Sequence, residues 1–295
     1  MSVPAEGLVV VDKPPGWTSH DVVGKLRRLA GTRRVGHAGT LDPMATGVLV
    51  CGVGRATRLL GHLALTDKTY TATIRLGMTT TTDDAEGEVV ATSTVAASDE
   101  AVAAAMAELT GDLAQVPSSV SAIKIDGERA YALVRAGKSV ELAARPVRVS
   151  RFTLLERRDQ DGQVDLDVIV DCSTGTYVRA LARDLGVALG CGGHLTALRR
   201  TRVGGFDLDA AAPLDRLVAQ GSVEGALLEL SEAVARAFPR RDLTAEQARE
   251  LSFGRRVPAS GVAGPVGGFA PDGTAVALLE DRDDLARPVV VFAPA

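Results

Sequence analysis

The chain has 295 residues, of which 46% are hydrophobic and 24% are charged, and its formal net charge is −4 at pH 7. This composition is typical of a globular protein that buries a core, and the length allows one large domain and one small domain. Since no run of eighteen apolar residues and no secretory signal are visible in the sequence, we expect no transmembrane helix and a cytoplasmic location.

The N-terminal part of the chain is predicted to alternate strands with helices. The expected elements are a buried strand at 8–11, a helix capped by Thr18 or Ser19 that runs to about Ala30, a loop at 35–46, a buried strand at 47–53 followed by a short helix through Leu60, and a strand at 69–76. The last segment alternates apolar with polar residues, which is the period of a strand.

The middle of the chain is predicted to be richer in strands. The expected elements are a helix capped by Ser98 that ends near Leu109, strand-like residues at 116–125, a helix at 128–136, strands at 147–155 and 164–171, a helix at 176–189 closed by Gly190, and a helical segment at 218–238. This mixture predicts an α+β fold with a mixed, mostly antiparallel sheet and surrounding helices.

The residue composition of the sequence changes near Arg240 and Arg241. The segment 261–274 contains five glycines among short apolar runs, and the chain ends in a further apolar run at 289–292. Short apolar runs separated by glycine are typical of a compact β structure. We therefore expect a large domain at 1–238 and a small C-terminal β-rich domain at 239–295.

The cysteines and histidines give no sign of a metal or disulfide site. Cys51, Cys172 and Cys191 are odd in number and far apart, and neither they nor the four histidines show ligand spacing. The sequence also lacks nucleotide-binding motifs. We expect buried thiols, no metal and no cofactor.

Charge is unevenly distributed along the chain. Residues 1–60 and residues 121–205 each carry a net charge of +4, whereas residues 61–120 carry −7 and residues 206–295 carry −5. Two basic segments would allow a polyanion to bind an acidic protein, and solvated helix faces explain each cluster equally well. The acidic stretch 83–86 is expected to face solvent.

The segment 36–47 is the most informative part of the sequence. Its three glycines allow backbone conformations that other residues resist, and Pro43 favours an extended conformation at Asp42. A carboxylate held in this way beside a buried strand can act as a nucleophile or a base. The same Asp-Pro pair also suits a simple turn capped by Asp42, so spacing alone leaves both interpretations open.

This segment resembles the catalytic motif of the TruB-type tRNA pseudouridine synthases, whose pattern is close to G-H-x-G-x-L-D-P-x-A-x-G. All eight specified positions are met, by Gly36, His37, Gly39, Leu41, Asp42, Pro43, Ala45 and Gly47. Further matches in the same order are Asp12-Lys13-Pro14 with Thr18-Ser19, Lys68-Thr69-Tyr70, Pro117-Ser118 with Ser121-Ala122, Gly175-Thr176-Tyr177-Val178-Arg179, and His194-Leu195 with Leu198-Arg199-Arg200. The resemblance covers residues 7–205, and residues 269–273 and 289–292 are more weakly similar to a PUA-like RNA-binding domain.

The resemblance implies an isomerase that converts uridine to pseudouridine at position 55 in the T-arm of tRNA, by base flipping and by cleavage and rejoining of the glycosidic bond. Asp42 is the implied catalytic carboxylate, acting at either C1′ or C2′ of the ribose. Arg179 is expected to pair with Asp42 and keep it ionised. Tyr70 is expected to stack on the uracil or remove its C5 proton, and Tyr177 to contact the base.

The remaining site residues are expected to bind the RNA. His37 would occupy the space left by the flipped base or contact the displaced strand. The other expected substrate-binding residues are Lys13 and Leu198, together with the candidate phosphate contacts Arg33, Arg34, Arg199, Arg200 and Arg202. Phosphate contacts supply affinity and salt dependence rather than sequence choice. The expected partner is tRNA, bound by a monomer without a membrane or a metal.

Three other functions fit the sequence less well. A non-catalytic RNA-binding or RNA-folding protein would not need a carboxylate that faces an anionic ligand. A nucleobase deaminase would need the H-x-E and P-C-x-x-C zinc signature, which is missing from the sequence. A glycosidase would need two working carboxylates, and the motif offers only Asp42.

Overall fold

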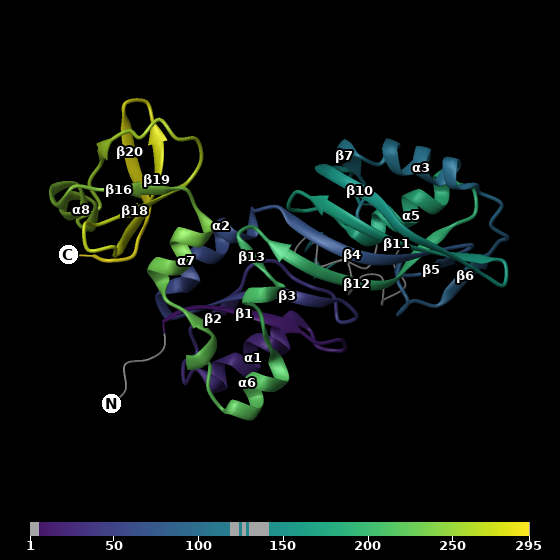
Figure 1. The fold of residues 1–295 in the computed structure, drawn as a ribbon, viewed down its shortest axis with the longest axis horizontal. Helices are drawn as coiled ribbons and strands as arrows, with labels where there is room; N and C mark the ends of the chain where they lie inside the picture. Colours follow the sequence, from purple (N-terminus) through teal and green to yellow (C-terminus); the bar gives the residue numbers. More distant parts are fainter. Residues whose placement is uncertain (1–5, 119–123, 126–127, 130–141, 295) are drawn as a thin grey trace. The chain divides into compact units, whose positions relative to one another are not determined.

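The computed structural model describes residues 6–118, 124–125, 128–129 and 142–294, which form two compact units. The first unit comprises residues within 1–42, 47–64 and 203–295, and the second comprises residues within 43–46 and 65–202. Figure 1 shows the elements of both units. Of the expected segments at 116–125 and 128–136, most residues lie outside the described part of the chain; the described pairs form β8 (Lys124–Ile125) and β9 (Glu128–Arg129).

The first unit is built on strand β1 (Gly7–Lys13), which is longer than the expected strand at 8–11. β1 pairs in antiparallel register with β3 (Thr46–Val53), and β2 (Val35–His37) continues the sheet beyond β3. On its other side β1 pairs with the short strands β14 (Ala212–Pro213) and β15 (Leu227–Leu228). The segment 35–46, expected to be a loop, therefore begins with a strand.

Helix α1 (Ser19–Leu29) covers a face of this sheet, and its start confirms the predicted cap. The side chain of Thr18 accepts from the backbone of Asp21 and Asp21 accepts in return, which is a capping box. The buried side chains of Val22, Val23 and Leu26 pack against apolar residues of β1 and β3. The apolar face of α1 and the apolar residues of β1 and β3 thus bury each other.

The second unit contains a five-stranded part of the sheet in the order β12-β4-β11-β10-β7. The strands are β12 (Gly193–Val203), β4 (Lys68–Leu76), β11 (Gln163–Cys172), β10 (Arg145–Gln160) and β7 (Gly111–Gln115). The pairs β4–β11, β11–β10 and β10–β7 are all antiparallel. Helices α3 (Asp99–Glu108) and α5 (Val178–Ala188) contact each other, and they contact β10 and β4 respectively (Figure 1).

The two faces of this sheet differ in polarity. Tyr70, Ala72, Ile74 and Leu76 of β4 are buried, whereas the alternate positions carry polar side chains. These polar residues form hydrogen bonds and ion pairs with aspartates of β11: Thr69 with Asp171, Thr73 with Asp167, and Arg75 with Asp165. Cross-strand pairs of this kind fix the register between β4 and β11.

The C-terminal residues form a separate five-stranded sheet in the first unit, in the order β16-β18-β19-β20-β17 (Figure 1). Its strands are β16 (Arg240–Asp242), β18 (Val266–Phe269), β19 (Ala275–Arg282), β20 (Leu285–Val291) and β17 (Val257–Pro258). Helix α8 (Ala245–Ser252), capped by Thr244, packs on this sheet through the buried side chain of Leu251. The predicted C-terminal β structure is confirmed.

The expected helical segment at 218–238 is wrong as a single helix. Gly221 adopts φ = 68° at the end of α6 (Leu214–Gln220), a left-handed conformation that stops the helix. The chain then forms η3 (Glu224–Ala226) and β15 before α7 (Leu230–Ala237) begins. The remaining elements are η1 (Gly54–Leu59), α2 (Leu60–Ala64), β5 (Met78–Thr80), β6 (Val89–Thr92), β13 (Phe206–Asp207) and η2 (Leu208–Ala210).

The observed architecture confirms the predicted α+β class with a mostly antiparallel sheet and a β-rich C-terminal part. The three cysteines are buried and form no disulfide, as expected. Among the described residues, no helix is long and apolar enough to cross a bilayer. Across the same residues, no group of three or more His, Cys, Asp or Glu side chains is arranged to hold a metal ion.

Candidate active site

Asp42 lies in the turn between β2 and β3, in the first unit, and its side chain is half-buried. Gly39 and Gly47 flank it with φ angles of 87° and 97°, where any side chain would be strained. Leu41, the residue before Asp42, is buried in the core. The carboxylate is therefore carried by a backbone that is fixed on both sides.

Ser19 holds this backbone directly. Its hydroxyl accepts a hydrogen bond from Leu41 N at 2.9 Å and donates one to Leu41 O at 3.1 Å. Ser19 is 1% exposed, so both bonds are shielded from water, and losing such a partner costs about 1–3 kcal/mol. The sequence suggests Ser19 as a helix cap and as part of the family match Thr18-Ser19; its contact with Leu41 spans 22 residues and has no local signal.

His37 lies at the end of β2, opposite Cys51 of β3. Its half-buried ring meets the ring of His20 edge-on, with 5.6 Å between centroids and an interplanar angle of 82°. The imidazole of His20, at the start of α1, thus lies beside that of His37 in the motif segment. His20, a second residue of this cluster, was not predicted, because a solvent-facing histidine at the start of a helix gives no signal by itself.

Tyr70, Tyr177 and Arg179 belong to the second unit. Tyr70 is 7% exposed and lies opposite Val170 of β11, on the apolar face of β4. Tyr177 is the N-cap residue of α5 and is half-buried. Arg179 is the second residue of α5 and is 4% exposed, so this long basic side chain is almost wholly inside the protein.

The guanidinium of Arg179 is held by the turn at 80–84. Nη1 donates to Thr82 O at 2.9 Å and lies 3.4 Å from Oδ2 of Asp84. The Asp84 carboxylate also accepts from Glu86 N at 3.0 Å and from the hydroxyl of Thr82. A buried arginine with a carboxylate partner is the arrangement that low polarity requires. The pairing of Arg179 with Asp42 stays a prediction.

The expectation that the acidic stretch 83–86 faces solvent is wrong for its two aspartates. Asp84 is 3% exposed, because its carboxylate satisfies the hydrogen bonds of its own turn and pairs with Arg179. Asp83 is half-buried and lies 3.4 Å from Arg183 Nη1. Ala85 and Glu86 are exposed, as expected. The acidic stretch therefore supplies a buried partner for Arg179 that its composition did not indicate.

The predicted substrate-binding residues differ widely in exposure. Lys13 is fully buried, and its ammonium donates to Pro14 O at 2.9 Å and Trp17 O at 2.7 Å, which closes the turn before α1. Arg33 and Arg34 are exposed between α1 and β2. On β12, Leu198 and Arg200 are buried, Arg199 donates to Thr46 Oγ1 at 3.3 Å, and Arg202 donates to Thr69 Oγ1 at 3.0 Å.

Lys68 is a buried cation two residues before Tyr70, on the same face of β4. Burial, followed by the nearby charge of Arg200, lowers the pKa of Lys68 to about 8, and its ammonium donates to Thr66 O at 2.7 Å. The facing residue on β11 is Cys172, whose pKa burial raises to about 11. Lys68 and Arg200 bring two positive charges into a buried region close to Tyr70.

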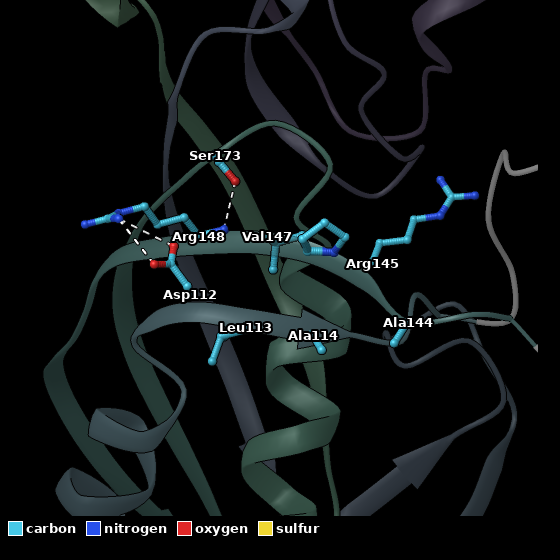
Figure 2. Close-up of a pocket in the computed structure, with 9 residues that line it drawn as sticks. Asp112, Leu113, Ala114, Ala144, Arg145, Val147, Arg148 and Ser173 are labelled. Carbon is cyan, nitrogen blue, oxygen red and sulfur yellow. Dashed lines mark hydrogen bonds and ion pairs between the residues drawn. The ribbon is translucent and has the colours of Figure 1, made fainter.

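An open hollow of about 560 Å³ lies where β7 meets β10, lined by Asp112, Leu113, Ala114, Ala144, Arg145, Pro146, Val147, Arg148 and Ser173. Figure 2 shows that Arg145 and Arg148 point away from each other, and that Arg148 turns toward Asp112, 3.4 Å away. The two arginines therefore do not converge on one anion. Ser173 accepts from Arg148 N at 2.9 Å and ties the loop before Tyr177 to β10.

Family models match most of the chain. The model described as "TruB family pseudouridylate synthase (N terminal domain)" matches residues 27–178. The model "tRNA pseudouridylate synthase B C-terminal domain" matches residues 179–232, and "tRNA Pseudouridine synthase II, C terminal" matches residues 238–293. Together these matches include Asp42, Tyr70 and Arg179.

Curated relatives are similar over nearly their full lengths. A "tRNA pseudouridine synthase B" of Arthrobacter sp. (strain FB24) is 60% identical over 98% of this chain and 97% of its own length. The proteins of the same name from Nocardia farcinica and Thermobifida fusca are 61% and 60% identical, over 99% and 98% of this chain and 94% and 99% of their own lengths.

Solved structures share the fold. The chain aligns with a "Crystal structure of the archaeal box H/ACA sRNP Nop10-Cbf5 complex" at a TM-score of 0.72 and 25% identity, covering 99% of this chain and 87% of that one. A "Cbf5-Nop10-Gar1 Complex" gives a TM-score of 0.73 at 25% identity, covering 99% and 84%. With its motif complete around Asp42 and its relatives 60% identical, the chain belongs to the TruB family of pseudouridine synthases.

Proposed function

We propose that this enzyme converts uridine-55 in the T-arm of tRNA to pseudouridine, with Asp42 as its essential carboxylate. The observation that carries the proposal is the rigid support of Asp42, whose neighbour Leu41 is held at both backbone polar groups by buried Ser19. The relatives are named as tRNA pseudouridine synthases, which specifies tRNA as their substrate. Recognition of a splayed-out base in an RNA loop suits a target in the T-arm.

The proposed reaction is an isomerisation and needs no added atom or redox step. The flipped uridine loses its bond between C1′ and N1, the uracil turns, and C1′ forms a bond to C5. C5 then loses its proton and N1 gains one, so the atoms balance. Asp42 either attacks C1′ or removes a proton at C2′, and both routes need the ionised carboxylate. Arg179 is proposed to favour that ionised form, as a cation lowers the pKa of a nearby carboxyl group.

The two tyrosines are proposed to handle the base. Tyr70, on the buried face of β4, would stack on the uracil or accept the C5 proton, and Tyr177 would contact the base from the start of α5. His37 is proposed to contact the strand from which the base is flipped. We propose that the enzyme acts on tRNA as a monomer in the cytoplasm.

Phosphate contacts are proposed for basic side chains that reach the surface. Arg33 and Arg34 are exposed and Arg199 and Arg202 are half-buried, so their guanidinium groups remain accessible. Arg200 is 1% exposed, so it is left out of the proposed phosphate contacts. These contacts would give affinity for tRNA without choosing its sequence.

The test is pseudouridine formation in an unmodified tRNA transcript, mapped by position, with the wild type beside Asp42→Asn. We expect product at the T-arm uridine alone, lost in Asp42→Asn while tRNA binding persists. Asp215→Asn, at an exposed aspartate of α6, is the control and should retain activity. A folded wild type that binds tRNA without making pseudouridine would instead indicate a non-catalytic role in tRNA binding or folding.

A further inference from the structure

Strand β7 ends at Gln115, an amide side chain that is 4% exposed at the edge of the second unit's sheet. The backbone of Gln115 lies opposite Arg145 of β10. Figure 2 shows the preceding part of β7 beside β10, with Ser173 above them in the loop that leads to Tyr177. The side chain of Gln115 therefore starts from a fixed strand, close to a segment that carries the family motif.

The Gln115 amide binds both backbone polar groups of Tyr177. Tyr177 N donates to Oε1 at 2.8 Å, and Nε2 donates to Tyr177 O at 3.2 Å. Tyr177 is the N-cap residue of α5 and has no side-chain cap of its own. Gln115, 62 positions earlier in the chain, thus accepts from a backbone N–H that has no intrahelical partner at this helix start, and it adds a second donor to Tyr177 O, which also accepts from Leu181 N.

These bonds fix more than one residue. Tyr177 has extended φ and ψ angles of −102° and 109°, and the chain turns helical at the next residue, so holding its peptide groups fixes where α5 begins. Arg179 follows two residues later and is held at its other end by Thr82 and Asp84. Any shift of the helix start would move both Tyr177 and Arg179.

We propose that Gln115 is a positioning residue of the active site, which sets Tyr177 and Arg179 in place for the reaction. This inference rests on the proposed function, because it assumes that Tyr177 and Arg179 act on the uridine. Gln115 acts through the backbone of Tyr177 and does not itself touch the reacting atoms. A displacement of about 1 Å at a catalytic group can lower turnover about a hundredfold.

The chemistry of the amide allows a sharp test. Glutamine carries an NH₂ donor group and a carbonyl acceptor in one plane, which match Tyr177 O and Tyr177 N respectively. In Gln115→Glu, the carboxylate can accept from Tyr177 N but repels Tyr177 O. Protonation of that carboxyl group restores a donor, and burial beside a carbonyl oxygen raises its pKa above the ordinary value for glutamate. Gln115→Leu keeps the bulk and removes both bonds.

The experiment compares kcat and KM for a tRNA transcript in the wild type, Gln115→Leu, Gln115→Glu and Asp112→Asn. For Gln115→Leu we expect kcat to fall about ten- to a hundredfold, with KM for tRNA within about threefold of the wild type. For Gln115→Glu, kcat divided by the wild-type kcat at the same pH should rise as pH is lowered from about 8 to about 5.5. Asp112→Asn, at an exposed residue of the same strand, should match the wild type.

Normal kcat in both Gln115 variants at every pH would overturn the proposal. A loss in Gln115→Glu that acid does not restore would also overturn it, because general misfolding rather than positioning would then explain the loss. Thermal unfolding of each variant at the same pH values shows how much protein is folded. An inactive wild type contradicts the proposed function itself, whereas an active wild type with fully active variants contradicts only the role of Gln115.

Discussion

Arg179 and Asp84 form an ion pair inside the second unit, with 3.4 Å between Nη1 and Oδ2 and with both side chains no more than 5% exposed. The same guanidinium nitrogen donates to Thr82 O. One buried arginine is thus fixed by a carboxylate and a carbonyl from the same turn. The proposed partner of Asp42 is therefore already ordered by the protein before any substrate arrives.

This pair predicts the effect of Asp84→Asn. Removing one charge from a buried pair leaves the other uncompensated, so we expect the free energy of unfolding to fall by about 3 kcal/mol. Turnover should also fall, because the Arg179 guanidinium loses the group that orients it, while the Kd for tRNA changes little. Chemical denaturation and kinetic assays measure the two effects.

The matched control is Asp83→Asn, the neighbouring aspartate, which lies 3.4 Å from the partly exposed Arg183. Since partly exposed pairs contribute about 1 kcal/mol or less, this variant should stay close to the wild type. Equal losses of stability and turnover in the two variants would contradict a specific role for Asp84.

Tyr70→Phe separates two roles of the tyrosine ring. Tyr70 is 7% exposed beside an apolar column on β4, so phenylalanine should fit without loss of packing. If the hydroxyl removes the C5 proton, this variant should bind tRNA normally, yet lose about a hundredfold or more in turnover. If the ring only stacks, turnover should remain within a few-fold of the wild type. Tyr70→Leu, which removes the ring, should be impaired in either case.

Arg33 and Arg34 predict the salt dependence of tRNA binding. Both are exposed, and each phosphate contact contributes about 0.7–0.9 to the slope of log affinity against log salt concentration. We expect Arg33→Ala with Arg34→Ala to weaken binding and to reduce this slope by about 1.5. Turnover at saturating tRNA should be unchanged. Arg216→Ala, at an exposed arginine of α6 in the same unit, is the control; an unchanged slope in the double variant would rule out these contacts.

Short-range sequence signals, such as helix caps and the alternation of apolar with polar residues, predict the elements that depend on neighbouring residues. Helices α1 and α3 begin at the residues Thr18 and Ser98 that can cap them, and β4 follows its alternation of apolar with polar residues. Strand β12 was missed, since its apolar and polar residues do not alternate: Arg200 is buried between half-buried Arg199 and Thr201. Strand β7 is short and lies at an edge, where sequence constrains little.

The candidate site was predictable only as a set of motif residues. Asp42, Tyr70 and Arg179 stand in recognisable patterns, whereas the contacts that support them have no pattern in the sequence. Ser19 holds Leu41 from 22 residues away, and Gln115 holds Tyr177 from 62 residues away. Such contacts depend on how distant segments pack, and a single serine or glutamine in one sequence carries no sign of them.

Lys68 predicts a measurable dependence of stability on pH. Burial and Arg200 lower its pKa from 10.5 to about 8 in the folded protein, so the charged form is disfavoured there. Between pH 8 and 10.5 the unfolded chain holds more protons at this group, and stability from Lys68 therefore rises with pH across that window. Below pH 8 the full penalty remains, on the order of 3 kcal/mol.

The variant Lys68→Met removes this penalty together with the hydrogen bond to Thr66 O. Its free energy of unfolding, measured relative to the wild type, should decrease by about 2 kcal/mol as pH rises from about 7 to about 10. Cys172 acts in the opposite direction, since its raised pKa removes stability above pH 9. Because the charge of Lys68 lowers the pKa of Cys172, its removal adds to the decrease of the variant's relative stability above pH 9. Lys25→Met, at a half-buried lysine of α1, accounts for the general loss of a charge. A difference between Lys68→Met and wild type that does not change with pH would show that Lys68 keeps an ordinary pKa in the folded protein.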